Sequence, residues 1–279
     1  MKTNNYEDQM KDYLNYLRVE ERSAATIGQY RRDVLCFFRF IKGRELTKEA
    51  ALYYKEELEQ KYRPVSVNAK LSALNSYFSF IGRTELKLKL LKIQKKVFCP
   101  AEKELSRAEY QRLVKTAQDR KNKKLSLLLQ TICSTGIRVS EVRYITVEAV
   151  SRGEAVIRLK GKNRTILLPK KLQKVLKDFA YREKIAAGPV FITRTGRSLD
   201  RSNIWKLMKA LCLDAGVDSK KVFPHNLRRL FARCFYSADK DIAKLADILG
   251  HSSINTTRIY IITSGAEHRR RLDALGFVV

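Results

Sequence analysis

The stretch His225-Asn226-Leu227-Arg228-Arg229 begins an apolar pattern that predicts a helix over residues 225–237. The expected buried stripe of this helix consists of Leu227, Leu230, Phe231 and Cys234. His225 and Arg228 are three residues apart and are expected to project together from another face. A core histidine would be expected on the apolar stripe, so both residues are candidates for chemistry. The alternative is a buried structural histidine.

Two further candidates follow along the chain. Leu249-Gly250-His251 closes the next expected helix, residues 239–249, because glycine commonly ends a helix. Tyr260 comes nine residues later, in an expected helix over residues 253–261. Taken alone, such a tyrosine is usually a core or surface residue, and an arginine such as Arg138 is usually a solvated charge. Their order along the chain is therefore more informative than any one of them.

The charge balance predicts a polyanionic partner. The 279 residues include 57 Lys and Arg against 29 Asp and Glu, which gives a net charge of +28. Such an excess attracts nucleic acid through counterion release, although ribosomal and membrane-surface proteins share it. The five cysteines are odd in number and form no Cys-x-x-Cys pair, which favours reduced thiols and argues against a zinc site.

The apolar patterning argues against a membrane protein. No apolar run approaches the roughly 18 residues of a membrane helix, and the first residues lack the apolar core of a signal peptide. We therefore expect a cytoplasmic protein with no membrane partner.

The patterning also divides the chain into two domains. Four helices are expected in the first ninety residues, the second behind an N-cap at Ser23, the third over residues 47–61 and the fourth after Pro64. A lysine-rich stretch then interrupts the pattern, so we expect a helical domain over 1–84, a basic linker over 85–104 and a second domain over 105–279.

The second domain is expected to be mainly helical with one β insert. Residues 155–168 alternate in polarity around Lys160-Gly161-Lys162-Asn163-Arg164, which predicts a hairpin. Further helices are expected at 106–120, 123–134, 170–185, 202–215 and, in the tail, around 266–275. The fold class is therefore mainly α with a small β-sheet (α+β).

The order of the motifs resembles the tyrosine recombinase (phage integrase) family. The matching motifs are Thr135-Gly136-Ile137-Arg138-Val139-Ser140-Glu141, Lys160-Gly161, His225-x-x-Arg228, Leu249-Gly250-His251 and Tyr260. In the first domain, Ser23-x-x-Thr26-x-x-x-Tyr30-x-x-Asp33 and Ser66-x-Asn68-x-x-Leu71-Ser72-Ala73-Leu74 are similar to the SAM-like core-binding domain of short Xer-type members. The resemblance implies a site-specific recombinase with a catalytic domain over residues 105–279.

The resemblance also implies the site and its partners. The family's six catalytic positions fall on Arg138, Lys160, His225, Arg228, His251 and Tyr260. The family cuts double-stranded DNA one strand at a time through a 3′-phosphotyrosine, with no metal and no cofactor. Four subunits act in a synapse, and an accessory protein takes part in some systems. The C-terminal tail docks on the neighbouring subunit in relatives; the alternative for this chain is that the tail packs on its own domain or frays. Integration, excision, inversion and dimer resolution all use this architecture.

The chemistry of these side chains agrees with such roles. A phenol titrates at about pH 10, so as a nucleophile it needs a proton acceptor. His225 can take this proton or hold the phosphate. Arg138 and Arg228 can clamp the phosphoryl oxygens, and His251 can donate a hydrogen bond to them. Lys160 can protonate the departing 5′-oxygen as general acid.

The hairpin departs from the family pattern. The family's turn reads Lys-Gly-x-Lys-x-Arg, and here it is one residue shorter. Lys160 matches the acid better because it follows a strand, with Lys162 as the alternative, and Arg164 is expected to contact the DNA backbone or to be a solvated charge. Two other functions stay open: a type IB topoisomerase-like enzyme acting on one duplex, and a regulator that binds DNA without cutting it.

Overall fold

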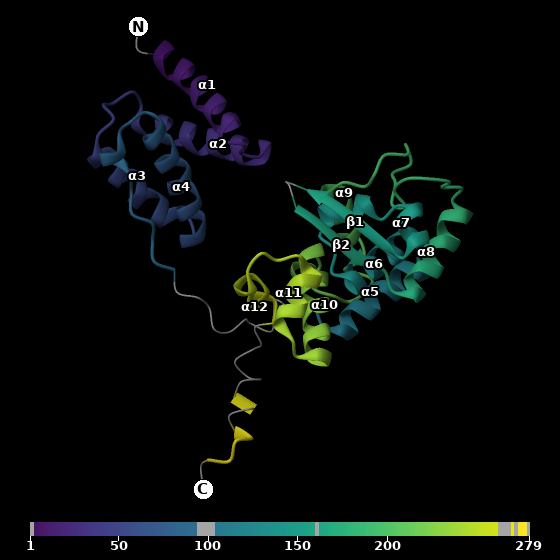
Figure 1. Ribbon diagram of the computed structural model, residues 1–279. Helices are drawn as coiled ribbons and strands as arrows, with labels where there is room; N and C mark the ends of the chain where they lie inside the picture. The colour runs from purple at the N-terminus through teal and green to yellow at the C-terminus, as the bar shows by residue number, and fades with distance from the viewer. Residues whose placement is uncertain (1–2, 94–103, 160–161, 262–268, 271–272, 278–279) are drawn as a thin grey trace. The chain divides into compact units, whose positions relative to one another are not determined.

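The chain folds into two compact units, residues 1–95 and 96–279 (Figure 1). The computed structural model describes residues 3–93, 104–159, 162–261, 269–270 and 273–277. The fold is mainly helical with a small two-stranded sheet, as the sequence predicts. No helix in the described part of the chain combines the length and apolar character needed to cross a membrane.

Unit 1 contains four helices around one apolar core. They are α1 (Thr3–Val19), α2 (Ala24–Ile41), α3 (Lys48–Lys61) and α4 (Pro64–Phe80). The predicted N-cap at Ser23 is confirmed, because its side chain accepts a hydrogen bond from the backbone N–H of Thr26. The core includes the aromatic rings of Tyr13, Phe37, Tyr77 and Phe78.

The start of the expected linker packs on unit 1. After the 3₁₀ turn η1 (Thr84–Leu86), Leu88 is buried in the core. Asn75 of α4 exchanges two hydrogen bonds of 2.8 Å with the backbone of Leu88. Asn68, two turns earlier, pairs in the same way with the backbone of Leu91, at 2.9 and 2.8 Å. The described residues 85–93 are therefore fixed along α4.

Unit 2 begins with α5 (Arg107–Asp119), α6 (Lys123–Thr135), the 3₁₀ helix η3 (Val139–Tyr144) and α7 (Val147–Arg152). Strands β1 (Glu154–Leu159) and β2 (Lys162–Leu167) form an antiparallel hairpin in which Leu159 pairs with Lys162. The remaining helices are α8 (Lys170–Arg182), α9 (Arg201–Lys209), α10 (Pro224–Asp239), α11 (Ile242–Leu249) and α12 (Ile254–Ile261), with a 3₁₀ turn η4 (Ser219–Lys221) before α10.

Two predictions about unit 2 are wrong in part, and a third is not tested. The helix expected over 202–215 ends at Lys209, because Leu211 and Cys212 bond three residues back and tighten the chain into turns. In α10, Leu227 and Leu230 are buried as expected, but Cys234 is exposed. The tail helix expected at 266–275 lies mostly outside the described residues.

Candidate active site

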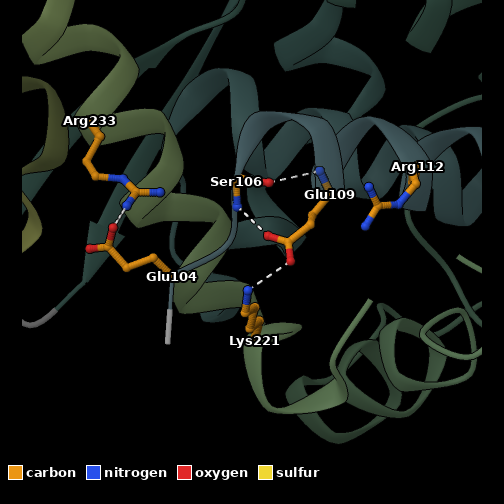
Figure 2. A pocket seen from close by; sticks show the side chains of 6 residues that line it. All are labelled: Glu104, Ser106, Glu109, Arg112, Lys221 and Arg233. Atoms are coloured by element: carbon orange, nitrogen blue, oxygen red, sulfur yellow. Dashed lines mark hydrogen bonds and ion pairs between the residues drawn. The ribbon is translucent and has the colours of Figure 1, made fainter. Parts of the chain in front are cut away.

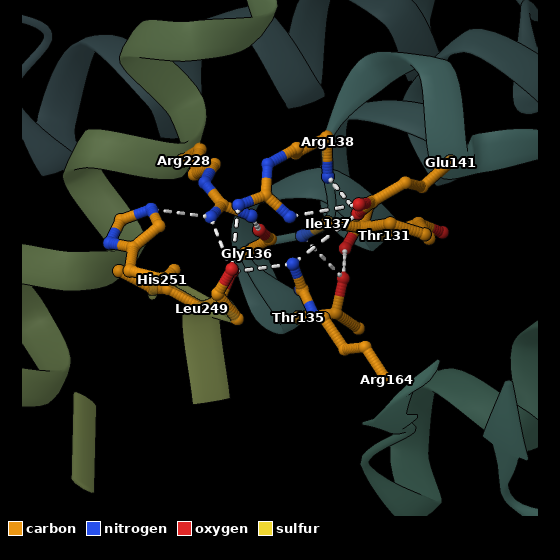
Figure 3. Close-up of polar contacts among 11 residues, drawn as sticks. Thr131, Thr135, Gly136, Ile137, Arg138, Glu141, Arg164, Arg228, Leu249 and His251 are labelled. Carbon is orange, nitrogen blue, oxygen red and sulfur yellow. Dashed lines mark hydrogen bonds and ion pairs between the residues drawn. The ribbon is translucent and has the colours of Figure 1, made fainter. Parts of the chain in front are cut away.

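Arg228 is a fully buried residue of α10, with 2% of its surface exposed. Its guanidinium donates to the carbonyl oxygen of Gly136 and, over 2.6 Å, to that of Leu249 (Figure 3). Gly136 caps the C-terminus of α6 and Leu249 ends α11, so both carbonyls belong to helix ends that leave acceptors unpaired. Two negative helix termini therefore stabilise one buried cation.

Arg138 lies next to Arg228 and is fixed by the carboxylate of Glu141. The buried Glu141 accepts the backbone N–H of Arg138 and its Nη1, both at 2.9 Å. Nη2 of Arg138 donates over 2.9 Å to the carbonyl of Gly250. The side chain of Arg138 keeps 38% of its surface exposed, so this guanidinium is both fixed and open to a ligand.

The ring of Tyr260 on α12 lies close to both histidine rings. Its ring centroid is 5.0 Å from that of His225 and 5.1 Å from that of His251. The guanidinium carbon of Arg228 lies 5.8 Å from the centre of the same ring. The structure thus brings together five of the six predicted site residues, drawn from the start of η3, from α10, from the end of α11 and from α12.

The surroundings of the histidines keep them neutral. Desolvation, followed by the charges of Arg228 and Arg138, lowers the pKa of His251 to about 4. Desolvation and the nearby Arg229 and Arg228 also lower the pKa of His225. A neutral imidazole beside the tyrosine is suited to accept its proton.

The buried arginine stays charged despite its surroundings. Burial, and after it the charge of Arg138, lowers the pKa of Arg228 to about 10, and Tyr260 opposes the shift. At neutral pH the site therefore presents a cluster of positive charge, which suits a phosphate. Among the described residues, no group of three or more His, Cys, Asp or Glu side chains is placed to hold a metal ion.

Neither candidate for the general acid has a described side chain. Lys160 lies outside the described residues, and of Lys162 only the backbone, at the start of β2, is described.

Sequence analysis also missed two supporting residues, Glu141 and Thr257. Glu141 stands three residues after Arg138, a spacing that often pairs charges on one turn. Thr257, whose Oγ1 lies 2.8 Å from Nδ1 of His251, stands three residues before Tyr260 and gives no sequence signal of its own.

A second set of charged residues lines an open hollow of about 450 Å³ away from Arg228 (Figure 2). Ser106 and Glu109 form a capping box at the start of α5, and Lys221 donates to Glu109 over 2.9 Å. Arg233 of α10 pairs with Glu104. Arg112, the remaining cation of the lining, donates to the carbonyls of Ala215 and Gly216. These contacts anchor the start of α5 and engage the charged side chains of the hollow.

Comparison with known proteins identifies the class. Residues 103–266 match the model of the phage integrase family, and residues 10–85 match that of the phage integrase N-terminal SAM-like domain. The chain belongs to the phage integrase family. It is a tyrosine-type site-specific recombinase, an enzyme of DNA recombination.

Particular relatives agree with this class. Tyrosine recombinase XerA of Pyrococcus furiosus is 29% identical over 262 residues, covering 90% of this chain and 88% of the relative. Tyrosine recombinase XerD of Halalkalibacterium halodurans is 26% identical over 278 residues, covering 90% and 91%.

Solved structures share the fold. XerH site-specific recombinase bound to difH substrate superposes with a TM-score of 0.69 at 21% identity, covering 90% of this chain and 79% of that one. A lambda integrase dimer bound to a COC′ core site superposes with a TM-score of 0.72 at 14% identity, covering 91% and 94%.

Proposed function

We propose that this recombinase cuts and rejoins duplex DNA through a 3′-phosphotyrosine link to Tyr260. The convergence of His225, His251 and Arg228 on the Tyr260 ring is the observation that carries the proposal. The Tyr260 oxygen attacks the phosphorus, and the bond from phosphorus to the 5′-oxygen breaks. The phosphotyrosine link conserves the energy of the broken phosphodiester bond, so rejoining needs no nucleotide cofactor.

Each proton transfer and each developing charge is assigned to a side chain in this scheme. His225 takes the proton of Tyr260, and Lys160, or Lys162 in its place, gives a proton to the departing 5′-oxygen. Arg138 and Arg228 balance the charge that develops on the nonbridging oxygens, and His251 donates a hydrogen bond to one of them. A 5′-hydroxyl from a partner strand then reverses the attack and releases Tyr260.

Assembly and location belong to the same proposal. The chain acts as a tetramer on two DNA sites in the cytoplasm, with its tail docked on a neighbouring subunit, and an accessory protein assists in some contexts. The strong positive charge supports DNA as partner. Of the structures that share this fold, that of XerH is bound to difH substrate and that of lambda integrase to a COC′ core site.

Covalent capture tests the chemistry and finds the target together. The full chain is incubated with fragmented genomic DNA in chelator, denatured in detergent, and the protein-linked DNA is sequenced. We expect the wild-type chain to retain a discrete sequence and Tyr260→Phe to retain none while still binding DNA. Equal covalent capture by both would reject Tyr260 as nucleophile. Strand exchange between two labelled duplexes then separates recombination from relaxation of a single duplex.

A further inference from the structure

Arg164 is a buried charge on the hairpin that carries the candidate general acid. It lies on β2, where it pairs with Ile157, four residues after Lys160. Only 9% of its side chain is exposed, and burial lowers its pKa. The expectation of a DNA-backbone contact or a solvated charge is therefore wrong, and this arginine has an internal role.

Arg164 shares both of its acceptors with the two phosphate-binding arginines. Its Nη1 donates over 2.5 Å to the carbonyl of Leu249, which also accepts from Arg228. The same Nη1 lies 3.5 Å from Glu141, whose carboxylate holds Arg138. Figure 3 shows these guanidiniums converging on the Leu249 carbonyl and the Glu141 carboxylate. One side chain thus connects the hairpin to both halves of the clamp.

The backbone of α11 is shaped to admit this side chain. Gly250 follows α11 with φ +61°, and a Cβ at this position would lie 2.3 Å from Cδ of Arg164. The stem of Arg164 therefore rests directly on Gly250, where no other residue leaves room. The hairpin and the end of α11 are fitted together at this contact.

The charge balance argues that Arg164 is more than packing. Three guanidiniums, those of Arg138, Arg164 and Arg228, meet with Glu141 as the carboxylate that pairs with two of them. Within the described residues, Nε and Nη2 of Arg164 are buried without a hydrogen-bond partner. An apolar side chain would fill the same space without this cost of desolvation and repulsion. The arginine therefore serves a purpose that an apolar residue cannot.

We propose that Arg164 is a positioning residue that ties the lysine-bearing hairpin to the phosphate clamp, so that the general acid reaches the departing 5′-oxygen. The inference rests on the proposed function. It predicts a defect confined to protonation of the leaving group, because Arg138, Arg228 and Tyr260 keep their other contacts when Arg164 is replaced.

A substrate with a better leaving group tests this directly. A duplex of the captured sequence is made with the scissile 5′-oxygen replaced by sulfur, which departs as a thiolate without a general acid. We expect Arg164→Met to slow covalent cleavage of the ordinary duplex about 100-fold, the lower range for loss of general acid catalysis. The sulfur substrate should restore cleavage to within about 10-fold of wild type, as it should for Lys160→Ala.

A matched control removes an arginine elsewhere in unit 2. Arg120 also donates to one carbonyl, that of Ala210, and pairs with one carboxylate, that of Asp214. Arg120→Met should cleave both duplexes at the wild-type rate, which shows that loss of such an anchor is harmless away from the hairpin. Arg164→Lys, which keeps a charge but not the shared acceptors, should behave like Arg164→Met.

The outcomes distinguish a failure of the role inferred for Arg164 from a failure of the proposed function. Equal slowing of both substrates by Arg164→Met would overturn the inference, since Arg164 would then act through the clamp or through folding. Rescue of Arg164→Met by a methylphosphonate duplex, which lacks the charge that the clamp binds, would overturn it in the same way. If the wild-type chain itself forms no Tyr260-dependent product on either duplex, the proposed function fails first.

Discussion

Nε2 of His251 lies 2.9 Å from Nη2 of Arg228. A guanidinium only donates hydrogen bonds, so Nε2 of His251 is the acceptor and carries no proton. Its other ring nitrogen, Nδ1, lies 2.8 Å from Oγ1 of Thr257 and therefore donates to this hydroxyl. To donate to a phosphate, Nε2 must gain a proton when DNA binds, a change that the negative charge of the phosphate favours.

The role of Thr257 can be tested by removing only its hydroxyl. Thr257 is fully buried, and valine has nearly the same shape without the acceptor for Nδ1. We expect Thr257→Val to slow covalent cleavage about 10-fold, the worth of one hydrogen bond, while Thr257→Ser stays close to wild type. Ring ¹⁵N shifts should show that His251 loses its single tautomer in the valine variant. Unchanged ring shifts in that variant would show that another group orients His251.

The lowered pKa of His251 makes stability depend on pH. The unfolded chain binds a proton at this ring as the pH falls through about 6.5, whereas the folded chain does so only near pH 4. The unfolded state binds more protons in this window, so the free energy of unfolding falls as the pH is lowered. Between pH 7 and pH 5 this loss is about 2 kcal/mol.

Removal of the titrating ring provides the measurement. Urea unfolding of wild type and His251→Gln at pH 7 and pH 5 should show a loss about 2 kcal/mol smaller in the variant. The variant's free energy of unfolding at pH 7 serves as its own reference. If both proteins lose the same free energy, His251 does not titrate as its surroundings indicate.

The sequence predicted most of the elements because their apolar periodicity is local. The helices of unit 1 and the hairpin of unit 2 follow directly from such patterns. The six-residue elements η3 and α7 were missed, because they are too short to show a helical period. Order along the chain was enough to select five residues, Tyr260 among them, that meet in one site.

The burial of Arg164 and Arg228 could not be predicted from the sequence. Arg164 looks like a solvated charge in a chain of net charge +28, and Arg228 is expected to project from its helix beside His225 and not to be buried. Their burial depends on the carbonyls of Gly136 and Leu249, which lie 113 positions apart and meet only after α6 and α11 pack near α10. No local pattern contains that convergence.

The carboxylate of Glu141 is predicted to hold the cluster together. Glu141→Gln keeps the shape of the side chain but removes its negative charge. Arg164, which is buried, and Arg138, which is half-buried, would then lie beside Arg228 without a counter-charge. We expect the free energy of unfolding to fall by about 3 kcal/mol and covalent cleavage to fall with it. Glu109→Gln, which loses the ion pair to Lys221 at the start of α5, is the matched control. A control that loses as much cleavage as Glu141→Gln would show a general effect of stability.

Gly136 is predicted to tolerate no side chain. Its φ of +62° disfavours other residues, and a Cβ would lie 2.5 Å from the ring of Phe231 and 3.0 Å from Leu249. Strain and overpacking together should lower the free energy of unfolding of Gly136→Ala by about 2–4 kcal/mol. Gly216→Ala has a similar φ of +57° with nothing within 4 Å, so it should lose only about 1 kcal/mol.

The same substitution should also disturb the site, because the Gly136 carbonyl accepts from Arg228. Any shift of this turn moves the anchor of the buried guanidinium, so cleavage should fall further than the fraction of folded protein. Both quantities are measured at a temperature where the variant is fully folded by circular dichroism. A folded Gly136→Ala variant that cleaves at the wild-type rate would show that Arg228 is placed by Leu249 alone.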